Sequence, residues 1–247
     1  MIEKRVDIAT QDGVMATFIV HPERGGPHPV VLFFMDAPGI REELRDMARR
    51  LATSGYYVML PNLFYRSGVE ELGNFIGEEG AAVRKKMFAL ISTLSIPLVM
   101  ADGDALLAFA DRDPAASKGA VGTLGYCMSG QYAIAAAGHR PDRIRAAASI
   151  YGVRLKTDAE DSPHLAAAKS QAEIYVAWAE TDHYAPLEEL APFQAALREA
   201  GVKHEVELYK GAEHGFAFPE RPAYNKDAAE RHWERLLALY ERTLRAR

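Results

Sequence analysis

The chain has 247 residues, of which 49% are hydrophobic and 26% are charged, and its formal net charge is -5. This apolar content excludes a disordered chain, and the slightly acidic balance argues against nucleic acid as the main partner. The single cysteine excludes an internal disulfide and a zinc site that is built from several thiolates.

The N-terminal residues show no targeting segment. The first ten contain no apolar stretch of the length that a signal peptide needs. No window approaches the roughly 18 consecutive apolar residues of a membrane-spanning helix. We therefore expect a cytoplasmic protein with no membrane partner. No pattern indicates an oligomeric state.

The chain begins with a pattern that is typical of a β-hairpin. Two strand-like runs, residues 4–9 and 14–20, flank the turn Gln11-Asp12-Gly13. A loop rich in Pro and Gly is expected over 21–29. The wholly apolar run 30–35 then fits a strand that is covered on both faces, as in a parallel sheet.

Helical and strand patterns alternate through the rest of the chain. The expected helices lie at 42–54, 81–94, 98–110, 129–138 and 225–244. The expected strands lie at 56–60, 119–125, 146–151, 174–179 and 204–209. A long polar loop is expected over 62–80. This alternation predicts a single α/β domain over 1–247, with a mostly parallel central sheet and helices on both faces.

The sequence GYCMSG at residues 125–130 lies between an expected strand and an expected Ala-rich helix. Small residues two positions before and after Cys127 suit a sharp strand–turn–helix bend that presents a nucleophile. The helix N-terminus favours a thiolate, and the Met128 N–H would face a developing oxyanion. The alternatives are a buried core thiol at Cys127, or Ser129 as the nucleophile.

A cysteine nucleophile needs a base, and the base needs an acid that fixes its tautomer. Among eight histidines, His214 directly follows the strand expected at 204–209, so it should lie at the same sheet edge as Cys127. We interpret the other histidines as ordinary loop, strand or helix residues. His21 and His28 are assigned to a surface loop, and His232 to an exposed helix position.

The acid is expected after the strand at 174–179. Asp182 is the favoured residue, because it lies deeper in the turn, and Glu180 is the alternative. The chain order of nucleophile, acid and histidine is that of the α/β-hydrolases.

The loop after the strand at 30–35 is expected to supply a second oxyanion donor. Ala37 can offer its backbone N–H, whereas Pro38 has none. Asp36 in the same loop is either a turn-forming residue or a second acid that contacts the thiol.

With these residues in place, the sequence resembles the dienelactone hydrolase family, the carboxymethylenebutenolidase-like α/β-hydrolases. The matching segments are MDAPGIREE, LPNLFYR, GYCMSG, AETDHYAP and GAEHGFAF. The resemblance implies a triad of Cys127, His214 and Asp182 that hydrolyses a lactone or ester through a thioester, without metal or cofactor. It also implies that Asp36 takes the place of the acid that holds the resting thiol.

The chain departs from the family pattern at two positions. Asp36 replaces a glutamate, and Phe218 stands where the family has an arginine for the substrate carboxylate. Arg66 and Arg84 are the cations that we consider in its stead. Aromatic residues near strand ends are expected to line the pocket, and these are Tyr65, Tyr151, Phe216 and Phe218.

The sequence thus predicts a hydrolase of a small lactone or carboxylic ester that acts through a cysteine acyl-enzyme. One alternative is a general carboxylesterase or thioesterase with a hydrophobic pocket, which Phe218 favours. Another is a non-catalytic α/β-hydrolase-like protein whose Cys127 senses oxidants. The chain has neither a phosphate-binding loop motif nor an H-E-x-x-H motif.

Overall fold

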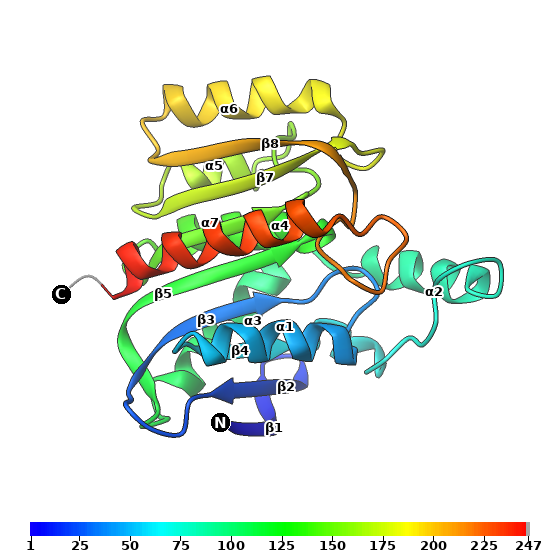
Figure 1. Cartoon of the computed structure of the whole chain (residues 1–247). Helices are drawn as coiled ribbons and strands as arrows, with labels where there is room; N and C mark the ends of the chain where they lie inside the picture. Colours follow the sequence, from blue (N-terminus) through cyan, green and yellow to red (C-terminus); the bar gives the residue numbers. More distant parts are fainter. Residues whose placement is uncertain (246–247) are drawn as a thin grey trace. The chain divides into compact units, whose positions relative to one another are not determined.

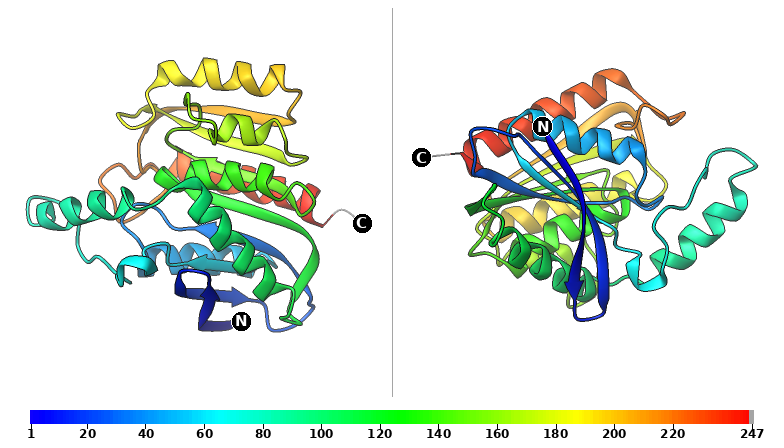
Figure 2. Two further views of the ribbon diagram at one scale, coloured as in Figure 1. Left: turned by 180° about the vertical axis from the view of Figure 1, so that it is seen from behind. Right: turned by 90° about the horizontal axis from the view of Figure 1, so that it is seen from below.

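The structure is a computed structural model that describes residues 1–245. It divides into two compact units, Met1–Lys118 and Gly119–Arg247. Each unit combines strands with helices on both faces (Figures 1 and 2). The expectation of a single domain remains a prediction.

The strands of the first unit lie in the order β1, β2, β4, β3, with bounds Ile2–Thr10, Gly13–His21, Tyr57–Pro61 and His28–Phe34. β1 and β2 pair antiparallel, which confirms the predicted hairpin, and β2 and β4 also pair antiparallel. β3 and β4 are parallel. Residues 30–35 are all buried, as their wholly apolar run predicts for a strand that is covered on both faces.

Helices cover both faces of these strands. α1 (Glu42–Thr53) packs on β2 and β4, and α3 (Ile96–Ala110) packs on β1 and β3 from the opposite face (Figure 1). α2 (Ala81–Ile91) projects away from the strands (Figure 2). The expected long loop contains the short 3-10 helix η1 (Tyr65–Ser67).

Helix α3 begins two residues earlier than predicted. Ser95 caps it by accepting a hydrogen bond from the Leu98 N–H, at 3.4 Å. Pro97 therefore lies in the first turn, where a missing N–H costs nothing.

In the described part of the second unit, four strands lie side by side in chain order: β5 (Ala116–Tyr126), β6 (Ile144–Ile150), β7 (Glu173–Thr181) and β8 (His204–Glu213). All three neighbouring pairs are parallel. The prediction of an α/β fold with mostly parallel strands is therefore confirmed. The loops at the carboxyl ends of these strands contain Cys127, Asp182 and His214.

The helices of the second unit also lie on both faces of its strands. α4 (Gly130–His139) packs on β6 from one face, while α7 (Lys226–Leu244) packs on β6 and β7 from the other (Figures 1 and 2). α5 (Pro163–Ala167) packs on α4, and α6 (Leu190–Glu199) contacts α5.

Within residues 1–245, no single helix has both the length and the apolar character to cross a membrane. α2 and α3 meet that criterion only when taken together, and they are bent by 84° relative to each other.

Candidate active site

Cys127 lies directly after β5, at the first position of the 3-10 turn η2 (Cys127–Ser129) that leads into α4. Its φ of 54° is in the left-handed region, which a residue with a side chain rarely adopts. The side chain is half-buried. Strained backbone of this kind persists only where the surroundings enforce it, and it occurs often at active sites.

Two glycines make this sharp turn possible. A Cβ on Gly125 would lie 2.0 Å from the backbone oxygen of Ser129. A Cβ on Gly130 would lie 2.3 Å from the Ser149 hydroxyl oxygen and 2.5 Å from the Gly152 Cα. This crowding confirms the prediction that the turn around Cys127 needs small neighbours.

The loops after β7 and β8 bring Asp182 and His214 together. The Nδ1 atom of His214 lies 2.6 Å from the Oδ2 atom of Asp182. The Asp182 side chain is fully buried, and its Oδ1 atom accepts hydrogen bonds from the N–H groups of Tyr184 and Ala185 at 2.8 and 3.0 Å. The backbone therefore holds the carboxylate that faces the imidazole.

Glu180, the alternative acid, has a different contact. Its Oε2 atom accepts a hydrogen bond from the Gly211 N–H at 2.8 Å, and the residue is exposed. The geometry thus favours Asp182 over Glu180 as the partner of His214.

The electrostatics of His214 link it to Cys127. Burial lowers the pKa of His214, but the electrostatic interaction with Cys127 and the hydrogen bond to Asp182 outweigh burial and raise the pKa to about 9. The Nε2 atom is buried and has no hydrogen bond of ordinary geometry within residues 1–245. An imidazole held at Nδ1, with Nε2 left for a proton transfer, is the arrangement that a general base needs.

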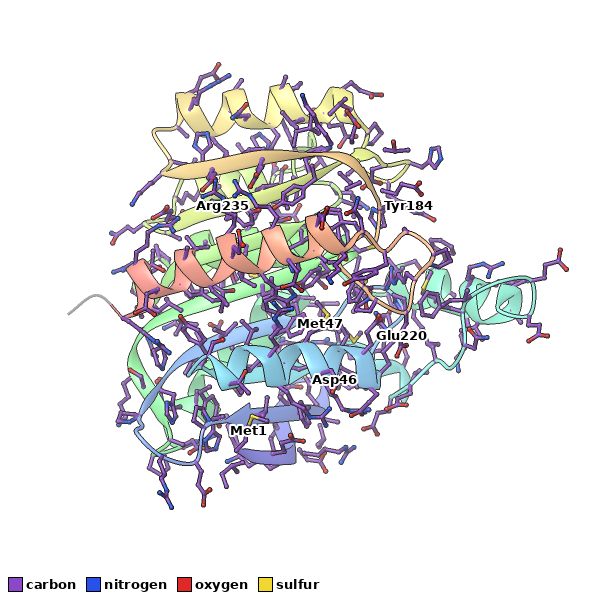
Figure 3. All side chains as sticks on the ribbon, viewed as in Figure 1. Met1, Asp46, Met47, Tyr184, Glu220 and Arg235 are labelled. Carbon is purple, nitrogen blue, oxygen red and sulfur yellow. The ribbon has the colours of Figure 1, made fainter. Side chains whose placement is uncertain are left out.

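Two tyrosine rings flank the imidazole of His214. The ring centroids of Tyr151 and Tyr184 each lie 4.9 Å from its centroid. Tyr151 directly follows β6, is buried and has a φ of 38°. Tyr184 lies in the loop after β7, where Figure 3 labels it, and is 58% exposed. Tyr184 was not among the site residues predicted from the sequence, although it lies two residues after the favoured acid.

The other aromatic candidates of the second unit are buried behind these groups. Phe216 and Phe218 are both fully buried, and Phe216 packs edge-on against Tyr151. The guanidinium carbon of Arg221 lies 4.3 Å from the centroid of the Phe218 ring. A cation is therefore close to the position at which the family pattern has an arginine. No sequence pattern pointed to Arg221, and contact of either phenylalanine with substrate stays a prediction.

Three histidines are buried, contrary to the interpretation from sequence. His232 on α7 is fully buried, and its Nε2 atom lies 2.9 Å from the Tyr126 hydroxyl oxygen. His21 ends β2 and His28 begins β3, because both strands extend into the segment that was expected to be a loop. His21 stacks on Tyr57 at a centroid distance of 5.1 Å.

In the first unit, Asp36 is fully buried and is held by an arginine. The Nη1 and Nη2 atoms of Arg41 donate to its two carboxylate oxygens at 2.6 and 3.2 Å. Arg41 also donates to Glu43, at 2.7 Å from Nη2. Burial lowers the pKa of Arg41, but the two carboxylates outweigh it and raise that pKa, so the guanidinium stays charged. Arg41, which lies five residues after Asp36, was not predicted from the sequence.

The two expected oxyanion donors are buried residues of tight turns. Ala37 lies in a turn that is closed by a hydrogen bond from the Gly39 N–H to the Asp36 carbonyl oxygen, at 3.0 Å. Met128 lies in η2, and its carbonyl oxygen accepts a hydrogen bond from Gln131 at 2.9 Å. The role of both N–H groups stays a prediction.

Tyr65 and Arg66 of η1 bind a buried carboxylate of α3. The Tyr65 hydroxyl donates to Asp102 Oδ1 at 2.9 Å, and Arg66 donates to both oxygens of Asp102 at 2.8 and 2.9 Å. Arg84 donates to the carbonyl oxygens of Phe75 and Gly77, in the loop before α2. These contacts hold the long loop in place, and a role of the three residues in substrate binding stays a prediction.

The part of the chain that the structure describes contains no group of three or more His, Cys, Asp or Glu side chains that could hold a metal ion.

The dienelactone hydrolase family model matches residues 15–244. The chain belongs to the dienelactone hydrolase family. A relative from Methylorubrum extorquens, provisionally named a carboxymethylenebutenolidase, is 30% identical over 96% of this chain and 79% of its own length. The chain is therefore an enzyme of the carboxylic ester hydrolase class that this family comprises.

Structures and other relatives agree with this membership. A crystal structure from Klebsiella pneumoniae, provisionally titled a dienelactone hydrolase, has a TM-score of 0.84 and 25% identity, and the match covers 97% of this chain and 98% of that chain. A Bradyrhizobium relative named "Probable 2-oxo-3-(5-oxofuran-2-ylidene)propanoate lactonase" is 27% identical over 94% of this chain and 91% of its own length. The predicted α/β-hydrolase fold and the family resemblance are confirmed.

Proposed function

We propose that this enzyme of the dienelactone hydrolase family hydrolyses a small lactone or carboxylic ester through a covalent thioester on Cys127. The observation that carries the proposal is the His214 imidazole. It is bound at Nδ1 by Asp182 and is coupled electrostatically to the thiol of Cys127. Nucleophile, base and acid come from loops after three different strands of the second unit.

In the first half-reaction, the Cys127 thiolate attacks the carbonyl carbon of the substrate and forms a C–S bond. The carbonyl electron pair moves to oxygen, and the backbone N–H of Met128 is the proposed donor to this oxyanion. The tetrahedral intermediate collapses, the C–O bond to the leaving alcohol breaks, and the His214 imidazolium gives that alkoxide its proton. A thioester and a neutral imidazole remain.

In the second half-reaction, the Nε2 atom of His214 takes a proton from water as the water attacks the thioester carbonyl. The C–S bond then breaks, which releases the carboxylic acid and regenerates the thiolate–imidazolium pair. Asp182 holds the imidazole in the tautomer that leaves Nε2 available, and it stabilises the positive charge. The second donor at Ala37 and the contact of Asp36 with the thiol stay predictions of the family resemblance.

A lactone or ester is the substrate class that the named relatives support, since one of them carries the name of a lactonase. A general esterase for uncharged substrates is the second candidate, because Phe218 replaces the expected arginine and aromatic rings surround His214. A panel of carboxylated lactones beside uncharged aryl esters separates the two. A free catalytic thiol also fits a reducing compartment such as the cytoplasm.

The experiment that tests the mechanism compares Cys127→Ala, His214→Asn and Ser129→Ala on such a panel, with intact-protein mass spectrometry during turnover. We expect Cys127→Ala to lose activity by about a thousandfold or more. His214→Asn should lower turnover to a similar extent, because both the thiolate and the deacylating water depend on the imidazole. Ser129→Ala should keep most of the activity, because Ser129 is the rejected nucleophile.

The acyl-enzyme is the specific readout. The wild type should gain the mass of one acyl group during turnover of a slow ester, and Cys127→Ala should gain none. Full activity of Cys127→Ala, or an acyl group on another residue, would refute the proposal. A wild type that turns over no ester but forms an oxidised Cys127 with peroxide would support the redox-sensing alternative instead.

A further inference from the structure

A buried histidine outside the proposed triad contacts the residue that precedes Cys127. His232 on α7 and Tyr126 at the end of β5 are both fully buried, and the Nε2 atom of His232 lies 2.9 Å from the Tyr126 hydroxyl oxygen. The two residues are 106 positions apart in the sequence. The hydrogen bond therefore joins the C-terminal helix to the last residue of the strand that carries the nucleophile.

Tyr126 is in turn packed against the aromatic residues near His214. Its ring centroid lies 5.8 Å from that of Tyr151 and 5.2 Å from that of Phe218. The Tyr151 ring lies against the imidazole of His214. Tyr126 is therefore bonded directly to Cys127 in the chain, and its ring packs against aromatic residues that lie near His214.

The backbone of Cys127 makes such an anchor necessary. A φ of 54° is unfavourable for a residue with a side chain, so the surrounding contacts must hold it. From the other side, the Val153 N–H donates to the Cys127 carbonyl oxygen at 3.1 Å. Tyr126 is the neighbour on the N-terminal side, and its hydroxyl is held by His232.

Stability alone does not require a polar pair at this place. A phenylalanine at either position would fill a similar volume, and burial of polar groups brings a desolvation cost that their hydrogen bond only offsets. A hydrogen bond differs from apolar packing in that it fixes the direction of the groups it joins. A fixed direction matters at the turn that carries Cys127, because a displacement of about 1 Å at a reacting atom lowers reaction rates strongly.

We propose that His232 is a positioning residue, which through its hydrogen bond to Tyr126 sets the direction in which Cys127 presents its sulfur. The inference rests on the proposed function, since it assigns to Cys127 the role of nucleophile. His232 is proposed to act through Tyr126 and not directly on the reacting atoms.

The test removes the hydrogen bond from either side with His232→Phe and Tyr126→Phe, and combines them in a double variant. His232→Gln serves as the conservative variant, since its amide still reaches toward the hydroxyl. Three quantities are measured on the full chain: the rate of Cys127 alkylation by iodoacetamide as a function of pH, kcat and KM for an ester substrate, and the free energy of unfolding.

The chain offers a matched control in Tyr240→Phe. The Tyr240 hydroxyl donates to the Thr123 carbonyl oxygen at 2.9 Å, so it is a second buried hydrogen bond between α7 and β5. Thr123 lies three residues before Tyr126 along β5, away from the turn that carries Cys127. Loss of this hydrogen bond should lower stability without changing alkylation or kcat.

We expect His232→Phe and Tyr126→Phe each to lower kcat by about tenfold to a hundredfold, with KM little changed, and to shift the pH midpoint of alkylation. His232→Gln should recover part of the loss, and the double variant should be no worse than either single variant, because one bond is lost in each. Tyr126→Phe, which removes one oxygen only, decides the matter if His232→Phe does not fold.

Wild-type alkylation and kcat in both single variants, with a stability loss like that of Tyr240→Phe, would overturn the proposal and leave His232 a purely structural residue. The alkylation measurement needs no ester. If the wild type hydrolysed none of the esters, the proposed function would fail, while the alkylation rates would still decide whether His232 positions the sulfur.

Discussion

The two carboxylate oxygens of Asp182 have different partners. Oδ2 contacts the imidazole of His214, while Oδ1 is held by the N–H groups of Tyr184 and Ala185. A carboxylate with one oxygen fixed by the backbone cannot rotate away from its histidine. The same loop also carries Tyr184, whose ring covers one side of the imidazole.

Replacement of Asp182 by Asn should lower kcat by a factor of about a thousand to ten thousand. The amide cannot stabilise the imidazolium, and it favours the wrong tautomer of His214. The measurement is steady-state hydrolysis of the best ester from the substrate panel.

Glu180→Gln is the matched control for this carboxylate, since Glu180 is exposed and its Oε2 atom accepts a hydrogen bond from the Gly211 N–H of the neighbouring strand β8. It should change kcat by about twofold or less. Equal losses in the two variants would remove Asp182 from its proposed role.

At the scale of secondary structure elements, the turn between β5 and α4 depends on the absence of side chains. Gly125 and Gly130 are places where a Cβ would meet backbone or a buried hydroxyl at close distance. The turn can therefore place Cys127 in a left-handed conformation only if both positions remain glycine.

Gly125→Ala should lower the free energy of unfolding by about 1–3 kcal/mol or more, because the new Cβ would lie 2.0 Å from the Ser129 backbone oxygen. It should also slow alkylation of Cys127. Urea denaturation and alkylation kinetics measure the two effects.

Gly103→Ala provides the comparison within a helix. A Cβ at Gly103 in α3 would meet nothing within 4 Å, so the substitution should stabilise the protein by about 0.5–1 kcal/mol. A Gly125→Ala protein as stable as the wild type would mean that the turn adapts and that its glycines are not needed.

Local patterns in the sequence predicted the strands and the turn at Cys127, whereas contacts between distant side chains could not be predicted. Apolar runs and the GYCMSG turn predicted every strand of the second unit and the position of Cys127, because these signals depend on neighbours in the chain. His232 was misplaced because its spacing along α7 does not reveal that Tyr126, far away in sequence, lies opposite it. Arg41 and Arg221 were missed for a similar reason, since their partners are set by side-chain geometry rather than by a motif.

At the scale of the whole molecule, His214 should make stability depend on pH. Its pKa rises from 6.5 to about 9 on folding, so the folded state binds more protons than the unfolded state between these values. The contribution of His214 to stability is therefore fully present below pH 6.5 and is lost as the pH rises to about 9.

The measurement is the free energy of unfolding of wild type and His214→Asn from about pH 5.5 to about pH 10, which extends about one unit beyond each of the two pKa values. The wild type should lose stability relative to His214→Asn across this window. His183→Asn, at an exposed position in the loop after β7, should keep the wild-type slope. Parallel curves for wild type and His214→Asn would contradict the coupling between His214 and Cys127.

Strands β1 and β8 each end the strand order of their unit on one side, and within residues 1–245 they pair with β2 and β7, respectively. Such borders can recruit a strand from another molecule and start aggregation. The charged residues of the two strands include Glu3, Lys4, Arg5, Asp7, Glu205, Glu207 and Lys210. A recruited strand would strip water from these charges, and the borders therefore resist fibril-like association when the protein is crowded.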